Sequence, residues 1–479
     1  MRIPTRTAFS SWLLLLTLAW LAVTPGIGPL VDAQGVASGW WQLRQQALYL
    51  TGVWAIGLMA LTMLLALRLP WLERPLGGMD QVYRLHKWAG IGAALAAIAH
   101  WGAKESSGWI RQLWGRAGKP AREAVLPWLT DSRGLAKDLG EWAFYLLLAL
   151  VALTLLTRLL AYRPWRWLHR AMPVLFLLLA FHSLALTPLA WWSQPTGLLM
   201  AGLLALGSAA ALWSLAGGVG RRRQHAGRVH AVQALGGQDA PLEVICALAP
   251  SWPGHRAGQF AFVHFHAPSQ TGQGGQSGQS SPWGEGAHPF TIASAQDSLG
   301  RSPQGEPLLR LVIKPLGDYT ARLHRHLTAG QALTLEGPYG RFDARGRQGR
   351  QQVWIAAGVG ITPFLALLEA RQPGRAQAPA QAPAQVPEAA GTVHMHYCTN
   401  ASASDPLLPR LRQLCAQARP PVTLQVHSDG QRLRPEDLER YDGPLDIWYC
   451  GPQSLGDALQ AHASGPRPWR LHRESFAMR

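Results

Sequence analysis

Cysteine is scarce in this sequence, with four residues among 479. All of them (Cys246, Cys398, Cys415 and Cys450) lie in the second half, and no two form a Cys-x-x-Cys pair. A thiolate zinc site or a cysteine-ligated iron–sulfur cluster needs closely spaced cysteines, so we expect neither. We expect the four thiols to stay reduced, as in cytosolic domains.

Acidic residues are also few: 27 Asp and Glu stand against 44 Lys and Arg, which gives a net charge of +17. Such an excess is typical of proteins that bind nucleic acid or anionic surfaces. The basic residues, however, cluster beside long apolar runs, at 2–6, 68–87, 158–170 and 221–223. This placement follows the positive-inside rule, and no nucleic-acid-binding module accompanies it. We therefore expect a lipid bilayer as partner and no nucleic acid.

The composition changes near residue 220. Before it, Leu, Ala and Trp dominate long uncharged runs; after it, charged residues, Gly and Gln recur every few positions. We predict a multidomain protein with an α-helical transmembrane bundle of about six helices in 1–220. A β-barrel domain in 221–349 and an α/β domain in 350–479 are expected to follow. In the α/β domain the expected strands are Val353–Ala357, Val393–Cys398 and Leu445–Cys450, and Phe364–Ala370 is an expected helix.

Six apolar segments are long enough, or nearly so, to cross a bilayer. They are Trp12–Val31, Ala47–Leu67, Leu85–Ala103, Trp142–Leu160, Leu168–Leu189 and Gly197–Leu215. The first could instead be a signal peptide, because helix breakers follow its apolar run and Val31-Asp32-Ala33 is a passable cleavage site. Either way the chain after Leu215 would be cytoplasmic, and 104–138 would form an external loop with seven basic and four acidic residues.

Histidine is nearly absent from the apolar half, where the only examples are His86, His100, His169 and His182. Each lies in the third or fifth span, and neutral imidazole is an axial ligand for haem iron. On an ideal helix, His86 and His100 lie about 21 Å apart along the axis and within about 40° of one face. His169 and His182 differ by about 140° in direction, a mismatch that a distortion at Pro173 could relieve.

The third and fifth spans run in the same direction, so depth assigns the pairs. His86 with His169 would bind an inner haem b, and His100 with His182 an outer one; no Cys-x-x-Cys-His attachment motif is present. The alternatives are histidines that only form hydrogen bonds, and a metal site or proton relay. No Asp or Glu lies deep in any span to support a relay.

Five motifs follow one another in the soluble half: His288-Pro-Phe-Thr-Ile-Ala-Ser294, Gly317-Asp-Tyr-Thr320, Gly337-Pro-Tyr-Gly340, Gly358-Val-Gly-Ile-Thr-Pro363 and Cys450-Gly-Pro452. The ordered set resembles the ferredoxin–NADP reductase superfamily. The His-Pro-Phe-Thr form, together with the histidine pairs, resembles its ferric reductase and NADPH oxidase branch of transmembrane flavocytochromes b. One glycine motif alone would be an ordinary strand-to-helix turn, but the order of five is far more specific.

The resemblance implies FAD, two haems b and NADPH or NADH as cofactors. It implies flavin contacts from His288, Pro289, Phe290, Thr291 and Ser294, and FAD pyrophosphate contacts from Gly317, Tyr319 and Thr320. Nicotinamide nucleotide contacts are implied for Gly358, Gly360, Thr362, Pro363, Gly451 and Pro452. The implied catalytic residues are Cys450, near the nicotinamide and flavin N5, and Phe476, which matches an aromatic position at the flavin.

One position departs from the NADPH-preferring relatives. They commonly place a basic residue after the motif that matches Tyr397-Cys-Thr399, and Asn400 follows it here. Arg432 or Arg434 could meet the 2′-phosphate instead, so NADPH and NADH both stay open.

The resemblance implies a transmembrane oxidoreductase of a bacterial inner membrane, with its reductase part in the cytoplasm. Electrons would pass from NAD(P)H to an external acceptor, with a ferric chelate as the first expectation and dioxygen, reduced to superoxide, as the second. A membrane metal or proton transporter with a nucleotide-binding tail is a further alternative, but it leaves the flavin motifs unused. The low-complexity segments 268–287 and 375–390 are expected to be loops without chemistry.

Overall fold

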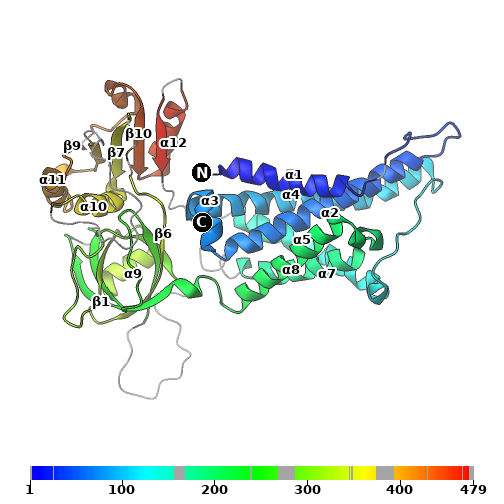
Figure 1. Cartoon of the computed structure of the whole chain (residues 1–479), viewed down its shortest axis with the longest axis horizontal. Coiled ribbons are helices and arrows are strands. Elements are labelled where there is room, and N and C mark those ends of the chain that lie inside the picture. Colours follow the sequence, from blue (N-terminus) through cyan, green and yellow to red (C-terminus); the bar gives the residue numbers. More distant parts are fainter. Residues whose placement is uncertain are drawn as a thin grey trace, which may run out of the picture. The chain divides into compact units, whose positions relative to one another are not determined.

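Helices fill the first half of the chain and two sheets fill the second (Figure 1). The computed structural model describes residues 3–24, 26–155, 168–237, 240–267, 286–344, 346, 349–373, 393–428, 430–465 and 468–473. The chain divides into a helical unit and a soluble unit between Val219 and Gly220.

The helical unit is built from long apolar helices. They are α1 (Thr5–Leu21), α2 (Ser38–Ala66), α3 (Pro70–Leu76), α4 (Met79–Trp114), α5 (Arg133–Leu155), α7 (Met172–Leu186) and α8 (Pro195–Leu215), with short 3-10 turns η1 (Pro127–Leu129) and η2 (Leu189–Ser193). Helix α2 packs along α4 and α8, and α7 packs against α5 and α8. Among the described residues, α2, α5 and α8 are long and apolar enough to cross a membrane.

Three predicted boundaries in this unit were wrong. Helix α1 ends at Leu21 rather than near Val31, because Gly26, Gly28 and Pro29 follow it. Helix α4 continues past the predicted end of its span at Ala103 to Trp114, and α5 starts at Arg133 rather than at Trp142, so both helices extend into the predicted loop 104–138. Charged residues end an apolar run, but they do not end a helix.

The first sheet of the soluble unit is antiparallel. Its strands are β1 (Gln224–Ala234), β2 (Leu242–Leu248), β3 (Phe260–Phe265), β4 (His288–Thr291), β5 (Leu308–Ile313) and β6 (Ala332–Tyr339), in the order β4-β3-β6-β1-β2-β5. Helix α9 (Asp318–His326) follows β5. A single isolated bridge, Ile292 to Leu311, joins the two ends of the described sheet. The predicted barrel is thus a sheet whose edges meet at one bridge.

The second sheet is parallel, in the order β11-β10-β7-β8-β9. Its strands are β7 (Gln351–Ala357), β8 (Val393–Cys398), β9 (Val422–His427), β10 (Leu445–Cys450) and β11 (Arg470–Arg473), with helices α10 (Thr362–Glu369), α11 (Leu408–Gln417) and α12 (Gln453–Ala463). All six residues of β10 are buried, as expected for a strand covered on both faces. The strand order reverses between β7 and β10, which is where open α/β sheets bind ligands.

The predicted strands at 393–398 and 445–450 have the expected bounds. Helix α10 (Thr362–Glu369) starts two residues before the predicted helix Phe364–Ala370 and ends one residue before it. Apart from Gly286 and Ala287, both low-complexity segments lie outside the described residues.

Candidate functional site

The four histidines of the helical unit form two facing pairs. The ring centroids of His86 and His169 are 6.0 Å apart, and those of His100 and His182 are 6.3 Å apart. Helix α4 supplies one ring of each pair. These are the pairs that the sequence predicted from depth.

The spacing of the rings fits one metal ion between each pair. Imidazole–metal bonds of about 2.0–2.1 Å on both sides of an ion would put the ring centroids about 6.3 Å apart. Each pair supplies two nitrogens, and no group of three or more His, Cys, Asp or Glu side chains that could hold a metal ion occurs in the described parts of the chain. A porphyrin supplies the other four nitrogens, so each pair suits a haem.

Backbone carbonyls on neighbouring helices orient three of the four rings. The Nδ1 atoms of His86, His100 and His182 lie 3.1, 2.9 and 2.8 Å from the carbonyl oxygens of Thr62, Leu48 and Ala136. A carbonyl only accepts hydrogen bonds, so Nδ1 carries the proton and donates it. Nε2 is then the unprotonated nitrogen, as in histidines that bind metals.

Glycines make room beside the rings of the second pair. A Cβ added at Gly140, on α5, would overlap the imidazole of His182. A Cβ at Gly52, on α2, would lie 3.2 Å from the imidazole of His100. The sequence analysis missed both positions; the available signal was a glycine inside an apolar helix.

The predicted 140° mismatch between His169 and His182 rested on one continuous helix, and the structure does not have one. The chain turns at Arg170 and Ala171, and α7 begins only at Met172, with Pro173 in its first turn. His169 therefore precedes α7, and its direction is not fixed by the period of that helix.

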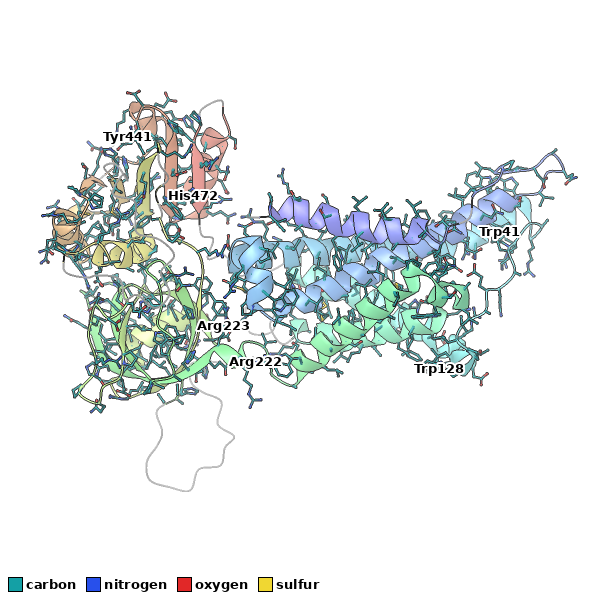
Figure 2. All side chains as sticks on the ribbon, viewed as in Figure 1. Trp41, Trp128, Arg222, Arg223, Tyr441 and His472 are labelled. Atoms are coloured by element: carbon teal, nitrogen blue, oxygen red, sulfur yellow. The ribbon has the colours of Figure 1, made fainter. Side chains whose placement is uncertain are left out.

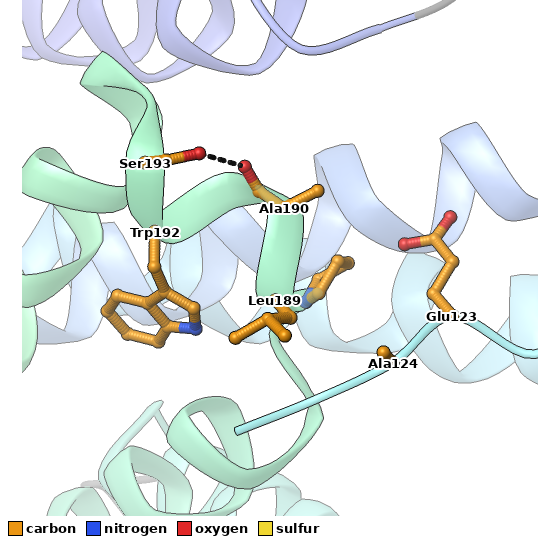
Figure 3. A pocket seen from close by; sticks show the side chains of 7 residues that line it. Glu123, Ala124, Leu189, Ala190, Trp192 and Ser193 are labelled. Atoms are coloured by element: carbon orange, nitrogen blue, oxygen red, sulfur yellow. Dashed lines mark hydrogen bonds between the residues drawn. The ribbon is translucent and has the colours of Figure 1, made fainter. Parts of the chain in front are cut away.

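A cavity of about 740 Å³ lies where η2 meets the segment before η1 (Figure 3). It is lined by Glu123, Ala124, Pro188, Leu189, Ala190, Trp192 and Ser193. Gln45 donates to the Glu123 carboxylate at 2.6 Å and to the Tyr49 hydroxyl at 3.2 Å. Tyr49 follows Leu48, whose carbonyl orients His100. The cavity wall is therefore connected to the second histidine pair through Gln45 and Tyr49. Trp41, on α2, and Trp128, on η1, lie at one end of the helical unit (Figure 2).

In the soluble unit, two glycine motifs meet at the switch point of the parallel sheet. A short 3-10 turn, η4 (Gly358–Ile361), follows β7, and α10 begins at Thr362 with Pro363 in its first turn. A Cβ at Gly360 would overlap the carbonyl of Cys450, which ends β10. Gly358 has a φ of 55°, which favours glycine. The N-terminus of α10 thus lies beside Cys450, where an anionic pyrophosphate is favoured.

The turn after β10 is firmly held. The Cys450 side chain is buried, and the hydroxyl of Tyr449 donates to the carbonyl of Pro452 at 2.5 Å. A Cβ at Gly451 would lie 2.8 Å from the same hydroxyl. The structure therefore brings Gly358, Gly360 and the Cys450-Gly-Pro452 motif together.

The motifs that start at His288 and at Gly317 also meet. The ring of His288, on β4, stacks on the ring of Tyr319, on α9, with centroids 3.7 Å apart and an interplanar angle of 16°. The Thr320 hydroxyl accepts hydrogen bonds from the N–H groups of Leu316 and Gly317 at 3.0 and 3.1 Å. The N–H groups of the first turn of α9 have no partner within the helix, so they suit an anion.

Thr291 and Ser294 are both buried. The Ser294 hydroxyl accepts a hydrogen bond from the backbone N–H of Arg310 at 3.0 Å. The backbone carbonyl oxygen of Ser294 lies 3.0 Å from Nε2 of His255. Burial lowers the pKa of His255, so this imidazole is neutral at pH 7. The sequence analysis missed His255, which lies in a loop without a motif.

The other predicted positions are Phe476 and the residues considered for the nucleotide 2′-phosphate. Phe476 lies outside the described residues. Asn400, Arg432 and Arg434 are all exposed, and the Tyr397 hydroxyl donates to Asp405 at 2.7 Å.

A histidine cluster on β8 and β9 was also missed. His396 is fully buried, its Nδ1 lies 2.9 Å from Nε2 of His427, and its Nε2 lies 2.9 Å from the hydroxyl of Tyr441 (labelled in Figure 2). Burial, then His427 and Arg440, lower the pKa of His396 to about 3. The signal was the histidines at 394 and 396, which share one face of a strand.

Sequence comparisons find a known family for part of the helical unit. Residues 51–180, which include His86, His100 and His169, match the family described as "Ferric reductase like transmembrane component". The beta subunit of a heme-dependent oxidative N-demethylase of Ectopseudomonas mendocina (strain ymp) is 33% identical over 160 residues, 32% of this chain and 45% of that protein. Ferric reduction oxidase 2 of Arabidopsis thaliana is 36% identical over 87 residues, 17% of this chain and 11% of that protein. This chain thus spans less than half the length of either relative.

Among solved structures, a flavohemoglobin from Malassezia yamatoensis with bound FAD and heme is similar with a TM-score of 0.42 and 14% identity, over 91% of this chain and 98% of that one. Full-length CYP116B46 from Tepidiphilus thermophilus has a TM-score of 0.37 and 18% identity, over 53% of this chain and 29% of that one. Residues 51–180 of the helical unit are thus similar to a ferric reductase-like transmembrane component.

Proposed function

We propose that this protein is a transmembrane oxidoreductase that moves electrons from NAD(P)H, through FAD and two haems b, to an acceptor on the opposite side of the membrane. One observation carries the proposal: α4 presents His86 and His100 to two partner histidines at two levels, each pair spaced for one haem iron. When bound, FAD accepts a hydride and releases single electrons, which the haems pass on.

The helical unit fixes the metal ligands. His86 and His100 are fourteen residues apart on one helix, so they lie about 21 Å apart along its axis. This distance would place two haems one above the other across a bilayer core of about 30 Å. The carbonyls of Thr62, Leu48 and Ala136 set the ring tautomers before a haem binds. We propose that α1, α4 and α7 complete a six-span bundle with α2, α5 and α8.

The soluble unit positions the nucleotide and the flavin. Gly358, Gly360 and the start of α10 would hold the nucleotide pyrophosphate, and Thr362, Pro363, Gly451 and Pro452 would shape this site. Cys450 would position the nicotinamide rather than act as a nucleophile, because its side chain is buried at a strand end. His288, Pro289, Phe290, Thr291, Ser294, Gly317, Tyr319 and Thr320 would surround FAD, and Phe476 would stack near it.

We propose a bacterial inner membrane as the location, with the soluble unit in the cytoplasm. The basic clusters beside the apolar segments support this orientation. An inside-negative membrane potential then favours outward electron flow by about 2.3 kcal/mol per charge for each 100 mV.

The external acceptor is proposed to be a ferric chelate. Residues 104–138 carry seven basic and four acidic side chains, so this region would attract anionic chelates. The cavity beside Glu123 is connected through Gln45 and Tyr49 to the His100 pair, which makes it a place where an acceptor could approach.

The proposal is tested with the purified full-length protein. We expect about two haems and one FAD per chain and anaerobic reduction of ferric citrate by NADH or NADPH. A haem-to-protein ratio near one would contradict the two-site assignment. Nucleotide oxidation with oxygen but not with ferric citrate, accompanied by superoxide, would replace the ferric chelate by dioxygen.

A variant separates the two haem sites. His100→Ala should remove the outer haem and abolish ferric citrate reduction, while NAD(P)H still bleaches the flavin. If His100→Ala retains both haems, His100 is not a ligand.

A further inference from the structure

Four charged side chains connect the two sheets of the soluble unit. They are Glu243 on β2, Arg310 on β5, Glu369 at the end of α10 and Arg410 on α11. Arg310 contacts Glu243 at 3.0 Å and Glu369 at 2.7 Å, and Arg410 contacts the same two carboxylates at 3.0 and 2.5 Å. We call these residues the four-charge cluster.

The four-charge cluster is closed and largely buried. Each arginine touches both glutamates, so two positive and two negative charges alternate around a ring. The side chains of Arg310 and Glu369 are each 7% exposed. Buried ion pairs stabilise a fold little compared with apolar residues of the same size, and their best-supported use is to select one arrangement of the parts they join.

Glu369 also contacts the segment that follows the first flavin motif. Its Oε2 accepts hydrogen bonds from the N–H of Ala295 at 3.1 Å and from the hydroxyl of Ser298 at 2.8 Å. Arg310 holds the same segment, because its backbone N–H donates to the Ser294 hydroxyl. One carboxylate therefore joins the end of the motif that starts at His288 to the helix that follows the motif starting at Gly358.

The charge of Glu369 is maintained near neutral pH. Burial alone would raise its pKa, but the guanidinium groups of Arg310 and Arg410, the Ser298 hydroxyl and the Ala295 N–H together hold the pKa below its ordinary value. The carboxylate is thus ionised under conditions where the protein would work.

We propose that the four-charge cluster sets the position of the nicotinamide site relative to the flavin site, with Glu369 as the positioning residue. This inference rests on the proposed function. Hydride transfer breaks the C4–H bond of the dihydronicotinamide, and the hydrogen with both electrons bonds to the flavin, which is reduced as the nicotinamide is oxidised. The reacting atoms must lie about 3–3.5 Å apart, and a misplacement of about 1 Å slows such a step about 100-fold.

The geometry of α10 explains why its far end matters. The helix has eight residues, so it is about 12 Å long and moves as one rigid piece. Gly360 lies against the Cys450 carbonyl in the turn η4, which leads directly into the first residue of α10, and the C-terminal residue of α10 is Glu369. A shift at Glu369 therefore moves the nucleotide motif relative to the segment around Ser294.

The test is Glu369→Gln in the full-length protein, which keeps the shape of the side chain but removes its charge. We expect the rate of flavin reduction by nucleotide to fall about 10- to 100-fold. The KM for the nucleotide should change less than about threefold, because the pyrophosphate contacts remain. With nucleotide deuterated at C4, the isotope effect should rise as hydride transfer becomes limiting.

Glu306→Gln is the matched control. It breaks the Arg228–Glu306 ion pair, whose side chains are 34% and 23% exposed and which belongs to the first sheet alone. Its flavin reduction should match that of the unmodified protein. Equal flavin reduction rates and isotope effects in Glu369→Gln and the unmodified protein would overturn the inference.

Arg410→Met provides a second variant if Glu369→Gln does not bind FAD, because Arg410 is the most exposed member at 28%. It should show the same loss in flavin reduction at an almost unchanged KM. In the double variant, losses that multiply would show that the residues act independently and would overturn the cluster as a unit. Failure of the unmodified protein to reduce its flavin with either nucleotide would instead refute the proposed function.

Discussion

Replacing Gly140 by alanine is expected to displace His182 and to weaken haem binding at the second pair. The new Cβ would overlap Nδ1, Cε1 and Cγ of the His182 ring, so the ring must move. Overpacking of this kind costs about 1–3 kcal/mol. Movement of the ring also breaks the hydrogen bond from Nδ1 to the Ala136 carbonyl, which costs about 0.5–1.5 kcal/mol more.

The two effects add to about 1.5–4.5 kcal/mol, which corresponds to an affinity loss of about 10- to 1,600-fold for the outer haem. The assay is the pyridine haemochrome content of purified protein, with low-temperature spectra of each haem. The haem-to-protein ratio should fall from near two toward one. Gly134→Ala is the control, because it lies on the same helix and a Cβ there meets nothing within 4 Å. If Gly140→Ala keeps both haems with unchanged spectra, His182 is not a ligand of the kind inferred.

Three further predictions concern the soluble unit. Cys450→Ala should slow flavin bleaching by nucleotide in rapid-mixing experiments while FAD and both haems stay bound; unchanged bleaching, or a covalent cysteine adduct during turnover, would refute the positioning role. NADH and NADPH should support similar turnover, and Asn400→Arg should favour NADPH; a strong NADPH preference in the unmodified protein would show that other residues meet the 2′-phosphate. His396 has a pKa of about 3 in the folded state, below its ordinary value of about 6.5, so stability should fall as the pH drops below 6.5, by at most about 1.4 kcal/mol per pH unit. Thermal unfolding between pH 7 and 5 should therefore depend less on pH in His396→Gln than in the unmodified protein, and equal slopes would contradict this.

Local sequence patterns predicted much of the soluble unit. The strands at 393–398 and 445–450 are short apolar runs bounded by turn residues. A run of this length that lies between helical segments is typical of a buried strand. The histidine pairs were predictable because charged and polar side chains are rare in apolar spans, so four histidines at matched depths stand out.

Other features depend on contacts between distant parts of the chain. Glu243 and Arg410, for example, are 167 residues apart, and no local pattern marks either as a partner of the other. The turn at Arg170 and Ala171 was also missed, because the apolar run continues across it. The role of Gly140 becomes visible only once α5 and α7 pack together.

The carbonyl oxygens that orient His86, His100 and His182 belong to the main chain, and this predicts an uneven tolerance to mutation. Every amino acid has such a carbonyl, so side chains at Leu48, Thr62 and Ala136 can be exchanged for others of similar size without loss of the acceptor. A deep mutational scan should therefore be intolerant at the histidines and permissive at the residues that hold them. A proline that bends α2 or α5 near these carbonyls should be as damaging as loss of a histidine, since it moves the acceptor itself.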